Sequence, residues 1–185
     1  MALRIAKNVG STGIDLAYES LGDEDAIPVV LIMGAGGQLI HWRKRFCSQL
    51  VARGLRVIRF DNRDAGLSTH VSDAPEPNIM AALGGDVSSA AYTLSDMADD
   101  TVGLLDSLGI QSAHLVGASL GGAIAQTVAI EHGNRVRSLT SIMSSTGNLA
   151  VGQMSPQAMH VLGAAAPNSR EEAIKQSVAA YRVMS

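Results

Sequence analysis

The stretch that decides the fold lies at residues 117–121, where the chain reads Gly-Ala-Ser-Leu-Gly. It follows the apolar run of residues 113–116 and precedes a helix-like stretch over residues 122–130. A G-x-S-x-G sequence between a strand and a helix is typical of a nucleophile elbow, a sharp turn that lifts a serine hydroxyl above a sheet. Gly117 and Gly121 leave room for the strand end and the helix start to approach closely. We therefore expect Ser119 at a helix N-terminus, where backbone N–H groups favour developing negative charge.

Segments with strand and helix patterns alternate on both sides of this turn. The predicted strands cover residues 3–7, 14–20, 28–33, 55–60, 112–117 and 136–143. Helical periodicity occupies residues 41–53, the stretch after a capping box at residues 93–96, and the stretch from the elbow to residue 132. Strands separated by helices predict βαβ units. The expected fold class is α/β, a doubly wound and mostly parallel sheet in a three-layer αβα arrangement.

The character of the sequence changes after residue 144. Residues 1–146 are predicted to form the core of the fold. Two helix starts follow, one at Ser155 and one at Ser169, with no further strand pattern. We expect residues 147–185 to begin a helical cap over the active-site cleft.

Composition and charge exclude several classes of protein. With 185 residues, 46% of them hydrophobic, the chain has enough material for one substantial core. A net charge of −3 provides no basic field for nucleic acid. No run approaches the roughly 18 apolar residues of a membrane span, and the first residues lack the apolar region of a signal peptide. The single cysteine, Cys47, has no partner for an internal disulfide. These features predict a cytoplasmic protein.

Neither a metal site nor a cofactor site is expected. Four aspartates, Asp96, Asp99, Asp100 and Asp106, fall in the helix after residue 93, where the pattern predicts an outward, solvated face. The glycine-rich residues 34–37 lack the third glycine of a dinucleotide fingerprint, because position 39 is leucine.

Three segments together resemble the α/β-hydrolase superfamily. The elbow is joined by residues 31–37, Leu-Ile-Met-Gly-Ala-Gly-Gly, which are similar to an oxyanion loop. Residues 61–68, Asp-Asn-Arg-Asp-Ala-Gly-Leu-Ser, are similar to the D-x-R-x-x-G-x-S loop of many esterases in that superfamily. Met33 stands where many members carry histidine. The set is most similar to the aclacinomycin methylesterase-like esterases.

The resemblance implies a serine hydrolase that cleaves carboxylic esters through an acyl-enzyme on Ser119. Its oxyanion hole would be formed by the backbone N–H groups of Ala35 and Leu120. Asp61 and Arg63 would brace their own loop. The implied substrate is a small apolar ester, and no cofactor is implied.

The catalytic base is missing from this pattern. In the superfamily the triad runs serine, acid, histidine along the chain. After Ser119 the only histidines are His132 and His160, of which His160 falls in the predicted cap, and no later strand pattern carries an acid or a His loop. We expect His132 to lie about three turns along the helix from the elbow, away from the strand ends. The resemblance therefore covers an incomplete, N-terminal portion of the fold, without the triad Asp and His.

Three explanations stay open for the missing base. The chain is part of a longer enzyme, cleaved or split so that a second polypeptide carries the C-terminal half, or it is a truncated gene product. In the third explanation it uses an unusual base such as His160 or His41. A sheet that ends at the sixth strand also leaves a hydrophobic edge that a partner segment would cover.

Other functional classes share these residues. One is a non-catalytic module of the same fold that binds a small apolar ligand or a partner chain. A thioesterase or a cofactor-free haloperoxidase would carry the same elbow. An epoxide hydrolase is disfavoured, because such enzymes of this fold carry aspartate at the position of Ser119.

Overall fold

The chain forms two compact units, Met1–Thr146 and Gly147–Ser185, in a computed structural model. The structure describes residues 2–74, 78, 86–148, 151–152, 155–162 and 167–184. The described part of the second unit contains two helices, α5 (Pro156–Leu162) and α6 (Arg170–Met184). Its role as a cap stays a prediction. Several residues of that predicted cap, 149–150, 153–154, 163–166 and 185, lie outside the described residues.

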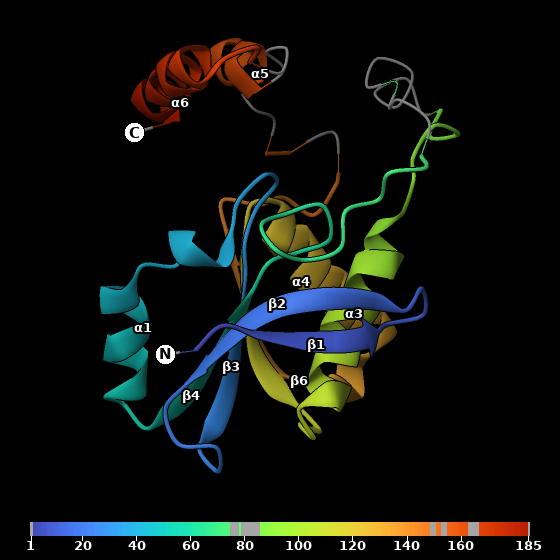
Figure 1. Cartoon of the computed structure of the whole chain (residues 1–185), viewed down its shortest axis with the longest axis vertical. Coiled ribbons are helices and arrows are strands. Elements are labelled where there is room, and N and C mark those ends of the chain that lie inside the picture. The colour runs from blue at the N-terminus through green and yellow to red at the C-terminus, as the bar shows by residue number, and fades with distance from the viewer. Residues whose placement is uncertain are drawn as a thin grey trace. The chain divides into compact units, whose positions relative to one another are not determined.

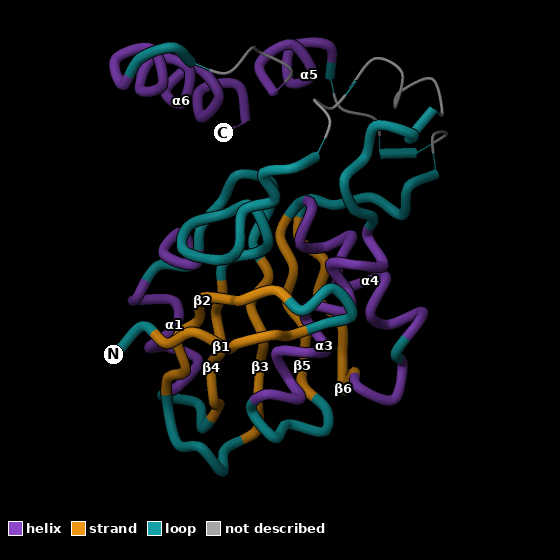
Figure 2. Tube along the Cα trace, turned by 45° about the vertical axis from the view of Figure 1, so that its right-hand side comes forward, coloured by secondary structure: helices purple, strands orange, loops and turns teal. Residues whose placement is uncertain are grey.

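The first unit is built on a six-stranded sheet with the order β1-β2-β4-β3-β5-β6. The strands are β1 (Arg4–Val9), β2 (Ile14–Leu21), β3 (Ile27–Ile32), β4 (Leu55–Phe60), β5 (Ala113–Ala118) and β6 (Val136–Ile142). β1, β2 and β4 pair antiparallel, whereas β4, β3, β5 and β6 run parallel and side by side (Figure 2). The predicted fold class, an α/β protein with a mostly parallel sheet, is confirmed.

Helices cover the sheet on both faces and complete three layers. α3 (Leu94–Ser107) and α4 (Leu120–Glu131) pack on one face, over a core that includes Ile32 and Leu115. α1 (Lys44–Val51) packs on the other face, beside Leu31 (Figure 1). β3 lies at the centre, and its last five residues are buried, as expected for a parallel strand covered on both sides.

The start of α3 is fixed by its local sequence. α3 starts with the predicted capping box, in which the Thr93 side chain accepts from the Asp96 N–H and the Asp96 side chain accepts from the Thr93 N–H. A short 3-10 helix, Gly133–Arg135, separates α4 from β6. Within the described residues, every helix is too short or too polar to cross a membrane.

The helix predicted over residues 41–53 is present but shorter than expected, and its first three residues are not part of it. The chain instead forms a 3-10 turn, Leu39–His41, and α1 begins only at Lys44. The reason is Arg59, a fully buried cation that donates to the carbonyl oxygens of Leu39 and Trp42. These carbonyls would otherwise accept helical hydrogen bonds, so the buried cation favours a turn at this point.

The predicted solvated face of α3 is wrong for Asp100. This residue is only 2% exposed, and its carboxylate accepts two hydrogen bonds from the Arg63 guanidinium, at 2.7 and 2.8 Å. Arg63 also donates to the hydroxyl of Thr12, in the turn between β1 and β2. Arg63 was expected to brace its own loop, and it instead joins that loop to α3 and to the β1–β2 turn.

Candidate active site

The elbow serine has a strained backbone. Ser119 lies between β5 and α4 with φ 53° and ψ −121°, a conformation that costs about 1–3 kcal/mol for a residue with a side chain. Its N–H donates to the Ile142 carbonyl at 2.9 Å, and its carbonyl accepts from the Gly122 N–H at 2.8 Å. The side chain is exposed. These two backbone bonds hold the strained turn between β6 and the first turn of α4.

The glycines of the elbow are required by close backbone contacts. A Cβ atom at Gly117 would lie 2.0 Å from the Gly121 carbonyl oxygen. A Cβ atom at Gly121 would lie 2.2 Å from the Ile32 carbonyl oxygen, at the end of β3. Both distances are far below van der Waals contact, so any side chain here would push the elbow away from the neighbouring strand.

The loop after β3 lies directly against the elbow. A Cβ atom at Gly34 would be 3.0 Å from Ser119 Cβ and 3.5 Å from Ser119 Oγ. The loop turns at Gly36, whose φ is 66°, and the Gly37 N–H closes the turn by donating to the Gly34 carbonyl at 3.0 Å. Ala35 is the remaining residue of this turn. The two segments predicted to form an oxyanion hole are therefore adjacent in space.

The two predicted oxyanion donors are the backbone N–H groups of Leu120 and Ala35. Leu120 is the first residue of α4, so its N–H has no partner within the helix. Ala35 is exposed in its turn. In the part of the chain that the structure describes, neither N–H donates a hydrogen bond to a protein acceptor. Ser119 Oγ likewise has no hydrogen-bond partner among those residues.

The loop after β4 holds the loop after β3. Asp61 is 3% exposed, and its carboxylate accepts from the Leu39 N–H at 2.6 Å and from the Leu67 N–H at 3.0 Å. Asn62 donates from its side-chain amide to the Met33 carbonyl at 2.9 Å. Sequence reasoning considered Asp61 as a brace but missed Asn62. The only signal for Asn62 was its place inside the D-x-R segment.

None of the histidines is hydrogen-bonded to Ser119 within the described residues. His41 Nδ1 accepts from the Gln38 N–H at 3.1 Å, and His132, at the end of α4, lies 2.9 Å from Asp99 Oδ1. His132 thus lies at the far end of the helix from Ser119. The other three are His70 beside the Gly66 carbonyl, His114 beside Ser138, and His160 in α5 of the second unit.

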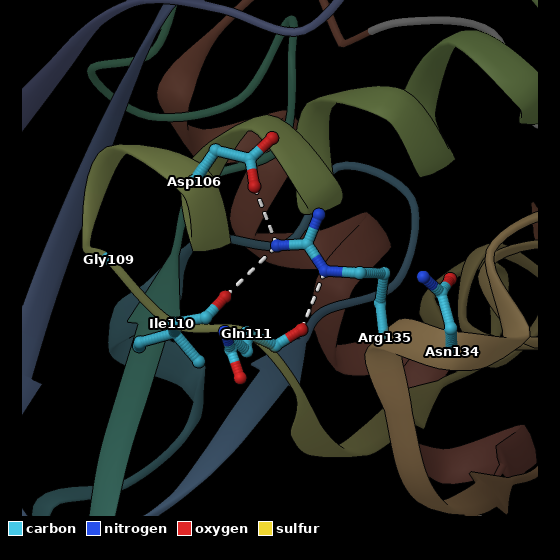
Figure 3. Close-up of a pocket in the computed structure, with 6 residues that line it drawn as sticks. All are labelled: Asp106, Gly109, Ile110, Gln111, Asn134 and Arg135. Atoms are coloured by element: carbon cyan, nitrogen blue, oxygen red, sulfur yellow. Dashed lines mark hydrogen bonds and ion pairs between the residues drawn. The ribbon is translucent and has the colours of Figure 1, made fainter.

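A pocket of about 490 Å³ lies at the opposite end of the sheet. It is located where the chain enters β5 and β6, and Figure 3 shows the Arg135 guanidinium pointing at its neighbours. Arg135 donates to the Gln111 and Ile110 carbonyls at 2.6 and 3.0 Å and to Asp106 at 2.6 Å. Through these contacts Arg135 joins the segment before β6 to the segment before β5. Among the described residues, no group of three His, Cys, Asp or Glu side chains could hold a metal ion.

Comparison with known proteins identifies the family. Residues 27–174 match the family model described as the alpha/beta hydrolase fold. The chain belongs to the α/β-hydrolase family. The predicted resemblance, including the similarity to methylesterases, is therefore confirmed.

Individual relatives of this α/β-hydrolase are hydrolases by name. The chain is 33% identical over 130 residues to rhodomycin D methylesterase from Streptomyces peucetius, a match that covers 70% of the chain and 39% of that enzyme. It is 35% identical over 121 residues to 2-hydroxymuconate semialdehyde hydrolase from a Pseudomonas species, with coverage of 65% and 37%. It thus spans less than half the length of these curated relatives.

The fold agrees with solved structures of the same kind. A thermophilic esterase from Thermogutta terrifontis superimposes with a TM-score of 0.63 at 25% identity, covering 85% of this chain and 50% of the esterase.

Proposed function

We propose that this chain carries the nucleophile and the oxyanion hole of a serine hydrolase that cleaves small apolar carboxylic esters through an acyl-enzyme on Ser119. The observation that carries the proposal is the backbone of Ser119, held at φ 53° with its side chain exposed beside Gly34. Strain of this kind persists only where the surrounding structure enforces it, and it is concentrated at functional sites.

The chemistry follows from the groups around the elbow. Ser119 Oγ attacks the ester carbonyl carbon while a base takes its proton, and the carbonyl oxygen becomes an oxyanion. The Ala35 and Leu120 N–H groups, which have no protein acceptor among the described residues, donate to that oxyanion. Collapse of the tetrahedral species expels the alcohol, which takes the proton back from the base. Water then hydrolyses the acyl-enzyme by the same two steps and releases the acid.

We assign the base and its acid partner to a second polypeptide that carries the C-terminal half of the fold. The free edge of β6 supports this assignment. Among the described residues β6 pairs only with β5, and residues 137–142 are all exposed, including Leu139 and Ile142 at 39% each. Parallel strands are normally covered on both faces, so an edge of this kind is suited to a further strand.

The proposal also includes a cap over the substrate and a cellular compartment for the enzyme. Helices α5 and α6 would begin a cap that covers the bound ester. The sole cysteine, Cys47, is buried and unpaired, which agrees with a reducing cytoplasm.

The nucleophile is tested by labelling with a fluorophosphonate probe, followed by mass spectrometry of the modified peptide. Ser119 and no other serine is expected to be labelled when the polypeptide carrying the rest of the fold is present, and Ser119→Ala is expected to abolish labelling. The matched control is Ser144→Ala, because Ser144 packs near Gly122 at the same elbow. Labelling that persists in Ser119→Ala would overturn the assignment.

The base is tested by hydrolysis of p-nitrophenyl butyrate. The 185-residue chain alone should be slow, since general-base assistance contributes about 10²–10⁴-fold. Reconstitution with a polypeptide carrying the rest of the fold should restore turnover that depends on Ser119. Rapid turnover by the chain alone that is lost in His160→Ala would place the base in α5. Absence of Ser119-dependent turnover in the reconstituted protein would favour a binding module.

A further inference from the structure

We propose that Asn62 is a positioning residue of the oxyanion hole. Its side-chain amide anchors the Met33 carbonyl, and through two successive peptide planes this anchor orients the Ala35 N–H. The inference rests on the proposed function of Ser119 and Ala35. It adds a residue that acts through the backbone of the loop after β3 rather than on the substrate.

The contact joins the first turns after two neighbouring strands. β3 and β4 are parallel and paired, so the segments that leave them emerge at the same edge of the sheet. Asn62 is two residues beyond the end of β4 and is 6% exposed. From there its Nδ2 donates to the Met33 carbonyl, one residue beyond the end of β3, at 2.9 Å. A buried bond of this kind fixes the direction of the peptide that it holds.

The Met33 carbonyl is also packed against the elbow. A Cβ atom at Gly121 would lie 2.8 Å from the Met33 carbonyl oxygen. The oxygen therefore lies between the Asn62 amide and the backbone of the helix that begins beside Ser119. Rotation of the Met33–Gly34 peptide would break the hydrogen bond, and the position of this peptide sets how the loop meets the elbow.

The next peptide plane carries the Ala35 N–H. In a trans peptide the N–H points opposite to the carbonyl of the preceding residue, and the described residues contain no cis peptide. The Gly34 carbonyl is held by the Gly37 N–H at 3.0 Å, which sets the direction of the Ala35 N–H. Gly34 joins the two planes. Because glycine has wide conformational freedom, holding the Gly34–Ala35 peptide alone does not fix the loop relative to β3. The hydrogen bond from Asn62 holds the Met33–Gly34 peptide on the other side of Gly34.

Other polar side chains of the loop after β4 have different targets. Ser68 accepts from the Ala17 N–H at 2.9 Å and donates to the Asp61 carbonyl at 2.6 Å, so it ties the loop to β2. Arg63 ties the loop to α3 through Asp100. A variant at Ser68 therefore disturbs the same loop without removing the bond to Met33, which makes it the matched control.

The experiment uses Asn62→Asp and Asn62→Ala with Ser68→Ala as control, in uniformly ¹⁵N-labelled protein. Asn62→Asp keeps the size of the side chain but replaces the donor by a carboxylate oxygen. In both Asn62 variants the Ala35 and Gly37 amide resonances should shift, and hydrogen exchange at Gly37 should accelerate by about 10-fold or more as the turn loosens. Ser68→Ala should leave both amides unchanged, and the dispersion of the spectra shows directly whether each variant is folded.

The second readout is the rate at which a fluorophosphonate modifies Ser119 in the chain reconstituted with a polypeptide that carries the rest of the fold, since the phosphoryl oxygen of the probe occupies the oxyanion hole. Displacement of one donor should lower the maximal rate by on the order of 10²-fold while the half-saturating probe concentration stays the same. Unchanged amides in both Asn62 variants, or an equal rate loss in Ser68→Ala, would overturn the positioning role. Loosened amides with no labelling of Ser119 in the unsubstituted chain, even after reconstitution with the rest of the fold, would overturn the proposed function itself, and with it the catalytic purpose of the anchor.

Discussion

The two ends of the parallel strands are built in opposite ways. At the carboxyl end, the Ser119 backbone is strained and its side chain is exposed. Within the described residues, neither Ser119 Oγ nor the Ala35 N–H has a hydrogen-bond partner in the protein. At the amino end, Arg135 lines a pocket of about 490 Å³ and is bonded to two carbonyls and to Asp106. The Arg135 guanidinium at the amino end is therefore satisfied by protein acceptors. The unsatisfied groups mark the carboxyl end, where ligands bind in open α/β sheets.

The difference shows how the fold divides its tasks. At the carboxyl end, strain and free donors are tolerated because buried bonds from Asp61, Asn62 and Arg63 hold the loops that carry them. At the amino end, the Arg135 guanidinium is held by two backbone carbonyls and by Asp106. Substitutions at the carboxyl end should therefore change the free energy of unfolding by a different amount than matched substitutions at the amino end.

The largest expected effect comes from breaking the buried ion pair at the carboxyl end. Arg63→Met leaves Asp100 unpaired, and with both side chains about 3% exposed this should cost about 3–5 kcal/mol of unfolding free energy. The counterpart at the amino end is Arg135→Met. Asp106 is 63% exposed there, so water replaces the lost partner and the expected cost is about 1 kcal/mol. Urea unfolding of both variants measures the comparison.

A double variant separates the charge from the packing. Arg63→Met combined with Asp100→Leu removes both buried charges, and apolar side chains of similar size often replace such a pair at little cost. The double variant should therefore recover much of the loss seen in Arg63→Met. Equal losses in Arg63→Met and Arg135→Met would contradict the contrast between the two ends.

A smaller effect is expected from adding one methyl group at each end. Gly117→Ala places a Cβ atom 2.0 Å from the Gly121 carbonyl oxygen, a backbone atom that cannot move alone. We expect a loss of about 1–3 kcal/mol, and a lower rate of Ser119 labelling because the elbow must shift. Gly133→Ala, in the turn before β6, meets no atom within 4 Å and should change stability by less than about 0.5 kcal/mol. Thermal unfolding of the two variants tests this difference, and an equal loss of stability in Gly117→Ala and Gly133→Ala would contradict it.

Much of the fold could be predicted from the sequence because its signals are local. The run at 55–60 coincides with β4, and the box at residues 93–96 caps α3 as expected. The failures share one physical cause, a partner distant in the sequence. Arg59 binds the Trp42 carbonyl just before the late start of α1 at Lys44, and Arg63 draws Asp100 into the interior. Neither interaction leaves a periodic pattern near the residue that it changes.

The candidate site shows the same division. The elbow was found from five consecutive residues whose spacing has a mechanical meaning. Asn62 was missed because its partner is a backbone carbonyl in the loop after another strand. Every residue has such a carbonyl, so the sequence does not show which one is the partner. The roles assigned to Ser119, Ala35 and Leu120 stay predictions until labelling and turnover are measured.

The smallest expected effect is a pH dependence at the carboxyl end. The Tyr92 ring lies 4.9 Å from the Arg63 guanidinium carbon. Burial, followed by a hydrogen bond to Asp64, raises the pKa of Tyr92 to about 12. A tyrosine in the unfolded chain ionises near pH 10, so between about pH 10 and about pH 12 the folded state retains a proton that the unfolded state has released. The folded state binds more protons in this window, and the free energy of unfolding must therefore fall as pH rises.

Tyr92→Phe tests this contribution, which is complete below about pH 10 and is lost as pH rises through about 12. Urea unfolding from about pH 9 to about pH 12 should show a shallower decline in Tyr92→Phe than in the unsubstituted chain. The matched control is Tyr181→Phe, because Tyr181 lies in α6 of the second unit and is 70% exposed. Its decline should parallel that of the unsubstituted chain. If Tyr92→Phe also gave a parallel decline, burial would not raise the pKa of Tyr92, and the phenol would make no pH-dependent contribution to the free energy of unfolding. The carboxyl end would then depend on its ion pair and on the hydrogen bonds to its backbone.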